Sequence, residues 1–311
     1  MDIKHLLQTT LSIMSFSCAA SESPFSYEIY NTLRPETEIS PKSVSALDQT
    51  KLAYYAFSAT QNKERAAAIL YHGGGAYSTP AYQWVAQQLA QQGISTYCFD
   101  IRGHGNSAGR RGDAPSVNLV LDDIGIAINV VKKQHPTVPV YLIGHSSGAG
   151  LLINYHHQRT DPRIAGYIML APYLGPQADA TRYTNKPQSF VKSVRVWVFI
   201  LNALLPVNWF NHFDAVYFNY PDHVLQADPK YVTTYSYVMS SATTPYEIKD
   251  MLAAWDSKPL WVFIGDKDEQ FLPDQVVTLC KKATPNAHII PDAQHLSILE
   301  KAPQLIADAI K

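Results

Sequence analysis

A pentapeptide centred on Ser146 constrains the fold of this chain more than any other feature. Gly144-His145-Ser146-Ser147-Gly148 fits the pattern G-x-S-x-G, follows the apolar run Val140–Gly144 and precedes a helical segment over Ala149–Gln158. At a sharp strand-to-helix turn the backbone of the central serine is strained, its neighbours must be small and its hydroxyl is exposed. The pattern alone occurs by chance and also suits an ordinary glycine-rich turn, but this setting predicts a nucleophilic serine.

From about Lys51 the chain alternates between short apolar runs and longer helical patterns. The runs have the character of strands buried on both faces of a parallel sheet, and they cover Ala67–His72, Ile94–Asp100, Val140–Gly144, Tyr167–Ala171, Leu260–Gly265 and Ala287–Ile290. Between and after them, helical patterns cover Tyr82–Gln92, residues 116–134 and Pro303–Ile310. This alternation predicts an α/β fold with a mostly parallel central sheet flanked by helices.

The alternation breaks between about Pro172 and Asp256, in a segment rich in Tyr, Phe, Trp and Asn. Its apolar run Val194–Leu205 has a helical pattern and is too short to span a bilayer, which needs about 20 residues. The run could be a buried core helix, but its place outside the alternation favours an inserted cap whose apolar face lines a substrate pocket or touches lipid.

We therefore expect three parts in the chain. Residues 1–50 form an N-terminal extension, residues 51–172 and 257–311 form the α/β core, and residues 173–256 form an inserted, mostly helical cap. Within the cap, Trp197, Phe199 and Leu201 are expected to line the substrate pocket.

A nucleophilic serine needs a general base and a group that orients the base. His295 is the candidate base, because it lies in a loop after an expected strand, ahead of the last helix, and last in the order serine, acid, histidine. The acid is sought in Asp266-Lys267-Asp268-Glu269, which follows a strand at the sheet edge where catalytic groups gather. Asp268 is preferred over Asp266 and Glu269 because it lies two residues into the loop and is freer to reach across.

The oxyanion formed when the serine attacks an ester needs N–H donors in fixed positions, each worth roughly 3–4 kcal/mol. The amide of Ser147 is one candidate, because it opens a helix, where free N–H groups and the helix dipole favour negative charge. The loop His72-Gly73-Gly74-Gly75 offers the other, with Gly74 as the donor, since glycines let the backbone approach a ligand closely. Phosphate binding is the alternative for this loop, but no Walker lysine follows it.

Charge and cysteine usage exclude several classes of function. The formal net charge is −1 and the Lys and Arg residues are not clustered, which argues against nucleic-acid binding. Cys18, Cys98 and Cys280 lack the spacing of a disulfide framework or a zinc site. His156 and His157 are adjacent on an expected helix and make a poor metal pair. We expect no metal and no organic cofactor.

The N-terminal segment has two interpretations. Lys4 and His5 precede the moderately apolar stretch Leu6–Cys18, and Cys18-Ala19-Ala20 resembles a small-residue cleavage site of an exported protein. Polar residues within the stretch, and Asp2 ahead of it, weaken that pattern. They slightly favour an amphipathic helix on a cytoplasmic protein.

Several motifs occur in a fixed order along the chain: His72-Gly73, the block D-x-R-G-H-G-x-S-x-G over residues 100–109, the pentapeptide around Ser146, Gly265-Asp266-Lys267-Asp268, and His295. Together they resemble the monoacylglycerol lipase / lysophospholipase (serine aminopeptidase S33-type) family of α/β-hydrolases, over roughly residues 50–310. The resemblance implies the α/β-hydrolase fold, Asp268 as the triad acid, Gly74 as an oxyanion donor, and structural roles for Asp100, Arg102 and His104. The triple glycine is also similar to esterases of the hormone-sensitive lipase type, which lack the R-G-H-G block.

These features predict a serine hydrolase that cleaves carboxylic esters through a covalent acyl-enzyme on Ser146, Asp268 and His295. The resemblance and the aromatic cap imply a monoacylglycerol lipase or lysophospholipase-like carboxylesterase, with an acyl-ester or lipid substrate and peripheral membrane contact through the cap. A peptidase or thioesterase with the same triad is the alternative. A lipid-binding protein on a hydrolase scaffold is the non-enzymatic alternative, which the intact triad disfavours.

Overall fold

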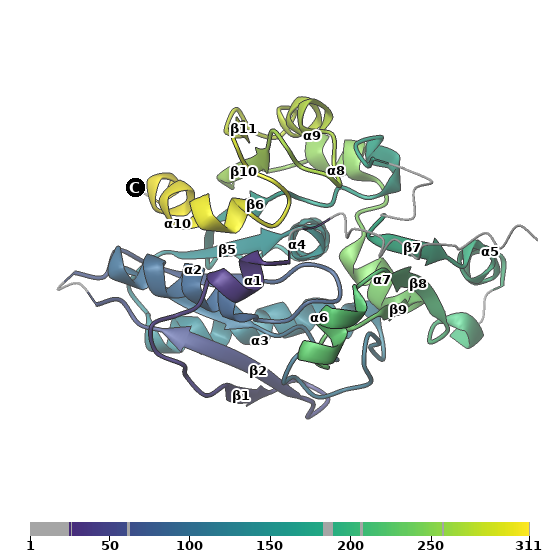
Figure 1. Cartoon of the computed structure of the whole chain (residues 1–311), viewed down its shortest axis with the longest axis horizontal. Coiled ribbons are helices and arrows are strands. Elements are labelled where there is room, and N and C mark those ends of the chain that lie inside the picture. Colours follow the sequence, from purple (N-terminus) through teal and green to yellow (C-terminus); the bar gives the residue numbers. More distant parts are fainter. Residues whose placement is uncertain are drawn as a thin grey trace, which may run out of the picture.

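The structure is a computed structural model that describes residues 25, 27–60, 63–182, 189–205, 208–256 and 258–310. Its centre is an eight-stranded sheet in the order β1-β2-β4-β3-β5-β6-β10-β11 (Figure 1). The strands are β1 (Lys42–Ser45), β2 (Lys51–Phe57), β3 (Ala66–Tyr71), β4 (Ile94–Phe99), β5 (Val140–His145), β6 (Ile164–Leu170), β10 (Leu260–Gly265) and β11 (Ala287–Ile290). All pairs from β4 to β11 are parallel, whereas β2 runs antiparallel to both β1 and β4. The expected mostly parallel sheet is confirmed.

Helices cover both faces of this sheet, which explains why its inner strands are apolar at almost every position. They are α1 (Ile29–Thr32), α2 (Pro80–Gln91), α3 (Val117–Gln134), α4 (Ser147–Gln158), α9 (Pro273–Cys280) and α10 (Ile298–Ala309). One apolar cluster joins the sheet to α3, α4 and α9, and a second joins its other face to α1, α2 and α10. Every residue of β3 and β4 is buried between the two clusters.

Two parts of the sheet and its cover differ from the expected pattern. The hairpin of β1 and β2 adds an antiparallel edge, so that residues 42–45 of the expected N-terminal extension belong to the main sheet. The last helix begins at Ile298, ahead of Pro303, which lies inside the helix and is buried. A proline usually marks the first turn of a helix, and this one lies further in.

The chain leaves the main sheet between β6 and β10 and forms an insertion, which projects from the end of the sheet where the parallel strands finish (green in Figure 1). Its elements are η2 (Pro176–Ala178), β7 (Val191–Val194), α5 (Val196–Leu204), η3 (Asn208–Phe210), β8 (Asp214–Phe218), α6 (Asp222–Ala227), β9 (Thr234–Ser236), α7 (Tyr237–Thr243) and α8 (Ile248–Ala253). Strands β7, β8 and β9 form a three-stranded antiparallel sheet that the sequence pattern did not indicate. The insertion lies where the cap was expected.

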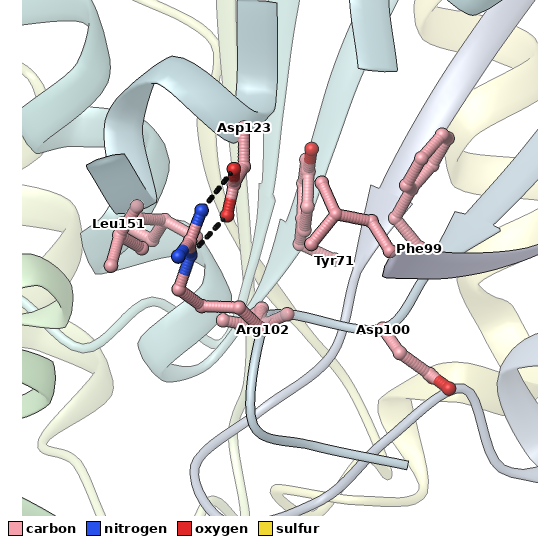
Figure 2. Close-up of a pocket in the computed structure, with 9 residues that line it drawn as sticks. Tyr71, Phe99, Asp100, Arg102, Asp123 and Leu151 are labelled. Atoms are coloured by element: carbon pink, nitrogen blue, oxygen red, sulfur yellow. Dashed lines mark hydrogen bonds and ion pairs between the residues drawn. The ribbon is translucent and has the colours of Figure 1, made fainter. Parts of the chain in front are cut away.

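Arg102, from the D-x-R-G-H-G block, is buried in the loop that follows β4. Its guanidinium donates to Asp123 of α3 at 2.6 and 2.7 Å, as Figure 2 shows, and to Asp48 of the β1–β2 turn at 2.8 Å. A buried charge is tolerated when it is paired and its hydrogen bonds are satisfied, which these two carboxylates provide. The contacts join the loop after β4 to α3 and to the hairpin, in keeping with the structural role expected for Arg102.

Other sequence-based expectations concern the N-terminal segment, the cysteines, membrane spanning and metal binding. The signal-like or amphipathic segment within residues 1–20, including Cys18, lies outside the described residues. Cys98 and Cys280 are buried free thiols. Among the residues that the structure describes, no helix is both long and apolar enough to cross a membrane, and no cluster of three or more His, Cys, Asp or Glu side chains is arranged to hold a metal ion.

Candidate active site

Ser146 forms the turn between β5 and α4 and has φ of 54° and ψ of −119°. A positive φ is uncommon for a residue other than glycine, and it is the strain expected of a nucleophile at a sharp strand-to-helix turn. Gly148, two residues on, lies so close to β3 that a Cβ atom there would come within 2.5 Å of the His72 carbonyl oxygen. The small residues around Ser146 therefore allow α4 to start directly against the sheet.

His295 and Asp268 complete a hydrogen-bonded line with Ser146. Nε2 of His295 lies 3.0 Å from the Ser146 hydroxyl oxygen, and Nδ1 lies 2.8 Å from Oδ2 of Asp268. The other oxygen of Asp268 accepts the backbone N–H groups of Gln270 and Phe271, both at 2.8 Å. Because a carboxylate can only accept, Nδ1 of His295 carries the proton and Nε2 is free to take one from the serine.

The other two acids of this loop bind backbone N–H groups. Asp266 accepts the N–H of Ala293 at 3.3 Å, and Glu269 accepts the N–H of His295 at 2.8 Å. The geometry therefore favours Asp268 as the partner of the imidazole, in line with the sequence-based preference. Glu269 gains a role that the sequence did not indicate, which is to hold the main chain of His295.

The two histidines beside Ser146 differ in charge behaviour. Burial alone would lower the pKa of His295, but the charge and the hydrogen bond of Asp268, followed by the charge of Glu269, outweigh burial and raise that pKa above its ordinary value. The protonated ring is thus stabilised, as a general base requires. Burial, followed by repulsion from His295, lowers the pKa of His145 to about 3. His145 therefore stays neutral and does not compete for the serine's proton.

Tyr82 of α2 fixes which ring nitrogen of the neutral His145 carries the proton. The Tyr82 hydroxyl accepts the N–H of Gly73 at 3.0 Å and lies 2.8 Å from Nδ1 of His145, while Nε2 of His145 lies 3.0 Å from the His295 carbonyl oxygen. Because that carbonyl can only accept, Nε2 of His145 carries the proton and Nδ1 accepts from Tyr82. His145, the first variable residue of the pentapeptide, thus links the main chain of His295 through Tyr82 to the glycine loop.

Gly74 and Ser147 lie next to one another beside Ser146. A Cβ atom built on Gly74 would be 3.3 Å from the Ser147 hydroxyl oxygen, so the glycine loop contacts the start of α4. In the described part of the chain, neither the Gly74 N–H nor the Ser147 N–H is paired with an acceptor. The first N–H groups of a helix have no partner within it. Both amides are therefore available to an oxyanion formed at Ser146.

A cavity of about 20 Å³ adjoins Ser146 and is enclosed mainly by aromatic rings. These rings belong to Phe25, Tyr27 and Tyr30 of the N-terminal segment and to Phe190 and Tyr220 of the insertion. The ring of Phe25 stacks on the imidazole of His295, with centroids 5.3 Å apart and planes inclined by 20°. One water molecule needs on the order of 10–15 Å³. The cavity is therefore too small to hold an ester in this conformation.

The structure does not bring Trp197, Phe199 and Leu201 to this cavity. They lie on α5, where Trp197 is 44% exposed and contacts Phe210 and Phe213, and Phe199 contacts Tyr237. The apolar sequence of α5 suggested a pocket-lining face, yet much of that face points to solvent. Its large exposed apolar side chains are Val196, Trp197, Ile200 and Leu204. Rings of the N-terminal segment line the cavity instead. Their position depends on tertiary contacts, which no local sequence motif indicates.

The sequence profile of the family described as serine aminopeptidase, S33, matches residues 62–302. The chain belongs to this family. The resemblance drawn from the ordered motifs is thereby confirmed. Among curated relatives of this S33 family member, a monoacylglycerol lipase of Mycolicibacterium smegmatis is 32% identical over 91 residues, which are 29% of this chain and 32% of the relative. A monoglyceride lipase of Rattus norvegicus is 30% identical over 112 residues, 35% of this chain and 36% of the relative. The chain matches about a third of the length of these relatives.

Solved structures resemble the S33 family member over most of its length. A soluble variant of monoglyceride lipase from Saccharomyces cerevisiae, in complex with a substrate analogue, covers 93% of this chain with a TM-score of 0.64 and 20% identity, and is itself covered over 98%. A monoacylglycerol lipase from Paleococcus ferrophilus covers 83% with a TM-score of 0.58 and 20% identity, and is covered over 98%. These likenesses confirm the α/β-hydrolase fold.

Proposed function

We propose that this protein is a serine hydrolase that cleaves carboxylic esters through a covalent acyl-enzyme. The observation that carries the proposal is the line from Ser146 through His295 to Asp268, with distances of 3.0 and 2.8 Å. It lies beside two amides that are available to an oxyanion. The lipase names among the relatives support an ester as substrate.

The geometry supports acyl transfer in two halves. Nε2 of His295 takes the proton of Ser146 as the serine oxygen attacks the carbonyl carbon, and the oxyanion accepts the N–H groups of Gly74 and Ser147. When the intermediate collapses, His295 gives the proton to the departing alcohol and the acyl group stays on Ser146. A water molecule then loses a proton to His295 and attacks the acyl carbon. The acid is released as His295 returns that proton to the Ser146 oxygen. Asp268 holds the useful tautomer and stabilises the charged ring throughout.

As substrate we propose an acyl ester of a lipid, such as a monoacylglycerol or a lysophospholipid. The rings of Phe25, Tyr27, Tyr30 and Phe190 beside Ser146 offer an acyl chain an apolar surface. The outward face of α5 and η3 supports a lipid surface as the source of substrate, because Val196, Ile200, Leu204 and Trp209 are 50–74% exposed. Large exposed apolar patches mark sites that contact proteins or membranes. We propose that this face makes peripheral contact with a membrane.

Labelling with a fluorophosphonate, which phosphonylates activated serines, tests the proposed nucleophile. We expect the wild type to be labelled and Ser146→Ala to be inert. The matched control is Ser147→Ala, which removes the neighbouring hydroxyl, keeps the backbone N–H and should still be labelled. Undiminished labelling of Ser146→Ala would disprove the assignment of the nucleophile.

Turnover of matched substrates tests the proposed substrate class. The series comprises a monoacylglycerol, a lysophospholipid, an acyl thioester and an aminoacyl anilide, all at equal concentration. Preference for the two lipid esters is the expected result. Faster cleavage of the thioester or the anilide would replace the proposal with a thioesterase or a peptidase. A wild type that is neither labelled nor active would instead favour a lipid-binding protein.

A further inference from the structure

Two tyrosines of the insertion hold one peptide unit of the glycine loop. The Tyr220 hydroxyl donates to the carbonyl oxygen of Gly74 at 2.7 Å, and the N–H of Gly75 donates to the Tyr235 hydroxyl at 2.9 Å. That carbonyl and that N–H belong to the same peptide unit, so both of its ends are fixed by side chains that lie far along the sequence. Tyr220 and Tyr235 are 7% and 2% exposed, so water hardly competes for these hydrogen bonds.

The preceding peptide unit is fixed by the α/β core. The carbonyl oxygen of Gly73 accepts the N–H of Ala76 at 3.2 Å and lies 2.9 Å from Nδ1 of His72. Nε2 of His72 accepts the N–H of Ile101 at 3.2 Å, so the proton of the neutral ring is on Nδ1, which donates to Gly73. Gly74 therefore stands between two fixed peptide units. Its own N–H belongs to the first of them and remains available beside Ser146.

The D-x-R-G-H-G block anchors Tyr235 in turn. Nδ1 of His104 lies 3.0 Å from the Arg102 carbonyl oxygen, and Nε2 lies 2.9 Å from the Tyr235 hydroxyl. A carbonyl can only accept, so Nδ1 of His104 carries the proton and Nε2 accepts from Tyr235. Each hydroxyl has one hydrogen to give, and Tyr235 gives it to His104, which leaves the Tyr235 oxygen to accept from Gly75. The hydrogen bonds from the Gly75 N–H to Tyr235, and from the Tyr235 hydroxyl to His104, therefore run in one direction without conflict between donors.

The main chain joins the insertion to the same loop. The N–H of Val232 donates to the Gly75 carbonyl oxygen at 2.7 Å. Gly75 has φ of 66°, and any Cβ atom there would collide with the Val232 carbonyl oxygen. A glycine is therefore required where the insertion crosses the loop.

We propose that Tyr220 and Tyr235 are positioning residues of the oxyanion hole, which is complete only while the insertion is seated on the core. This inference rests on the proposed function, because it concerns the same reaction. Three consecutive glycines have a large conformational freedom, whereas stabilising an oxyanion requires donors that are fixed before the reaction. The two tyrosines supply the rigidity that the loop lacks. If the insertion moves away from the core, the Gly74–Gly75 peptide unit loses both hydrogen-bond partners. Catalysis therefore requires the insertion to be seated on the core.

Steady-state kinetics on a soluble short-chain ester test this role. The variants are Tyr220→Phe and Tyr235→Phe, and the matched control is Tyr217→Phe, whose ring on the same small sheet lies under Arg195. Loss of a whole oxyanion donor costs about 100- to 1000-fold in kcat, so a misplaced donor should cost on the order of tenfold. We expect kcat to fall by that factor in both variants, with KM within about twofold and the control unchanged.

Inhibition by a trifluoromethyl ketone distinguishes positioning from a general loss of structure. Addition of the serine oxygen to this ketone forms a tetrahedral oxyanion, whereas the matching trifluoromethyl alcohol forms none. We expect the inhibition constant of the ketone to rise by the factor that kcat loses, and that of the alcohol to stay constant. Equal shifts for both compounds, or an unchanged kcat in Tyr220→Phe and Tyr235→Phe, would overturn the proposal.

Two further arrangements keep the test decisive. If Tyr235→Phe does not fold, Tyr220→Phe gives the answer alone, because it leaves the pair of Tyr235 and His104 intact. Failure of the proposed function has a different signature, in which the wild type itself neither hydrolyses the ester nor binds the ketone more tightly than the alcohol.

Discussion

Glu269 holds the main chain of His295 by accepting its backbone N–H at 2.8 Å, while the adjacent Asp268 holds the imidazole at the same distance. Two neighbouring carboxylates thus act on the backbone and the ring of one histidine. Both of their charges favour the protonated ring and raise the pKa of His295 against the opposing effect of burial. The pH dependence of activity should therefore respond to Glu269 as well as to Asp268.

Glu269→Gln should extend activity to lower pH. The amide oxygen can still accept the N–H of His295, but the negative charge that raises the pKa of His295 is gone, so this pKa falls. The base works only when neutral, and a lower pKa keeps it neutral in more acidic solution. The acid limb of the pH profile of kcat/KM, which reports the free enzyme, should move down while the plateau stays within about twofold. A limb that stays in place or moves up would contradict this account.

Asp268→Asn should lower kcat by about 10⁴-fold, the loss known when an amide replaces the acid of such a triad and favours the wrong tautomer. The measurement is kcat at the pH plateau. Asp266→Asn serves as the control, because Asp266 binds the N–H of Ala293 and an amide oxygen can replace it there. A larger loss in Asp266→Asn than in Asp268→Asn would reverse the assignment of the acid.

Phe25→Ala should widen the range of acyl groups that the site accepts. The ring of Phe25 stacks on His295 and encloses the cavity of about 20 Å³. We expect kcat/KM for a branched or long acyl ester to rise relative to that for an acetyl ester by about tenfold, the scale at which a pocket discriminates small changes in size. Phe213→Ala removes a ring that is 45% exposed on the insertion and should leave this ratio unchanged. Equal ratios in both variants would refute the role of Phe25.

Arg102→Leu should destabilise the fold by about 3–5 kcal/mol, because it leaves Asp123 buried without its partner. The free energy of unfolding is measured by urea titration. The double variant Arg102→Leu with Asp123→Leu removes both charges and should recover part of the loss. If the double variant is less stable than the sum of the two single changes predicts, the pair is not the source of the effect.

Most of the core was predictable because its signals are local. A continuous apolar run such as Val140–Gly144 suits a strand covered on both faces, and the structure has a strand at Val140–His145. The candidate site could be predicted for the same reason. Ser146, Asp268 and His295 each follow a strand and lie in loops at the carboxyl-terminal end of the parallel strands.

The remainder depends on contacts between distant parts of the chain. Tyr220 and Tyr235 bind a loop 146 and 160 residues away, and no local pattern distinguishes them from the other tyrosines of this chain. The surroundings of helix α5 were not predictable for a related reason: an apolar helix must face something, but its sequence does not say whether this is a pocket or an outer surface. The small sheet of β7, β8 and β9 was missed because its strands are short and largely exposed or half-buried.

The stacking of Phe25 on His295 has a practical consequence for anyone who shortens this protein. A chain that starts at residue 40 would keep every strand of the main sheet and the complete line from Ser146 to Asp268. It would nevertheless expose one side of the imidazole to water and lose three of the rings that enclose the cavity. Its substrate profile would then be that of an enzyme whose site is open on this side. The match to the family at residues 62–302 therefore marks common ancestry rather than the boundary of the working site.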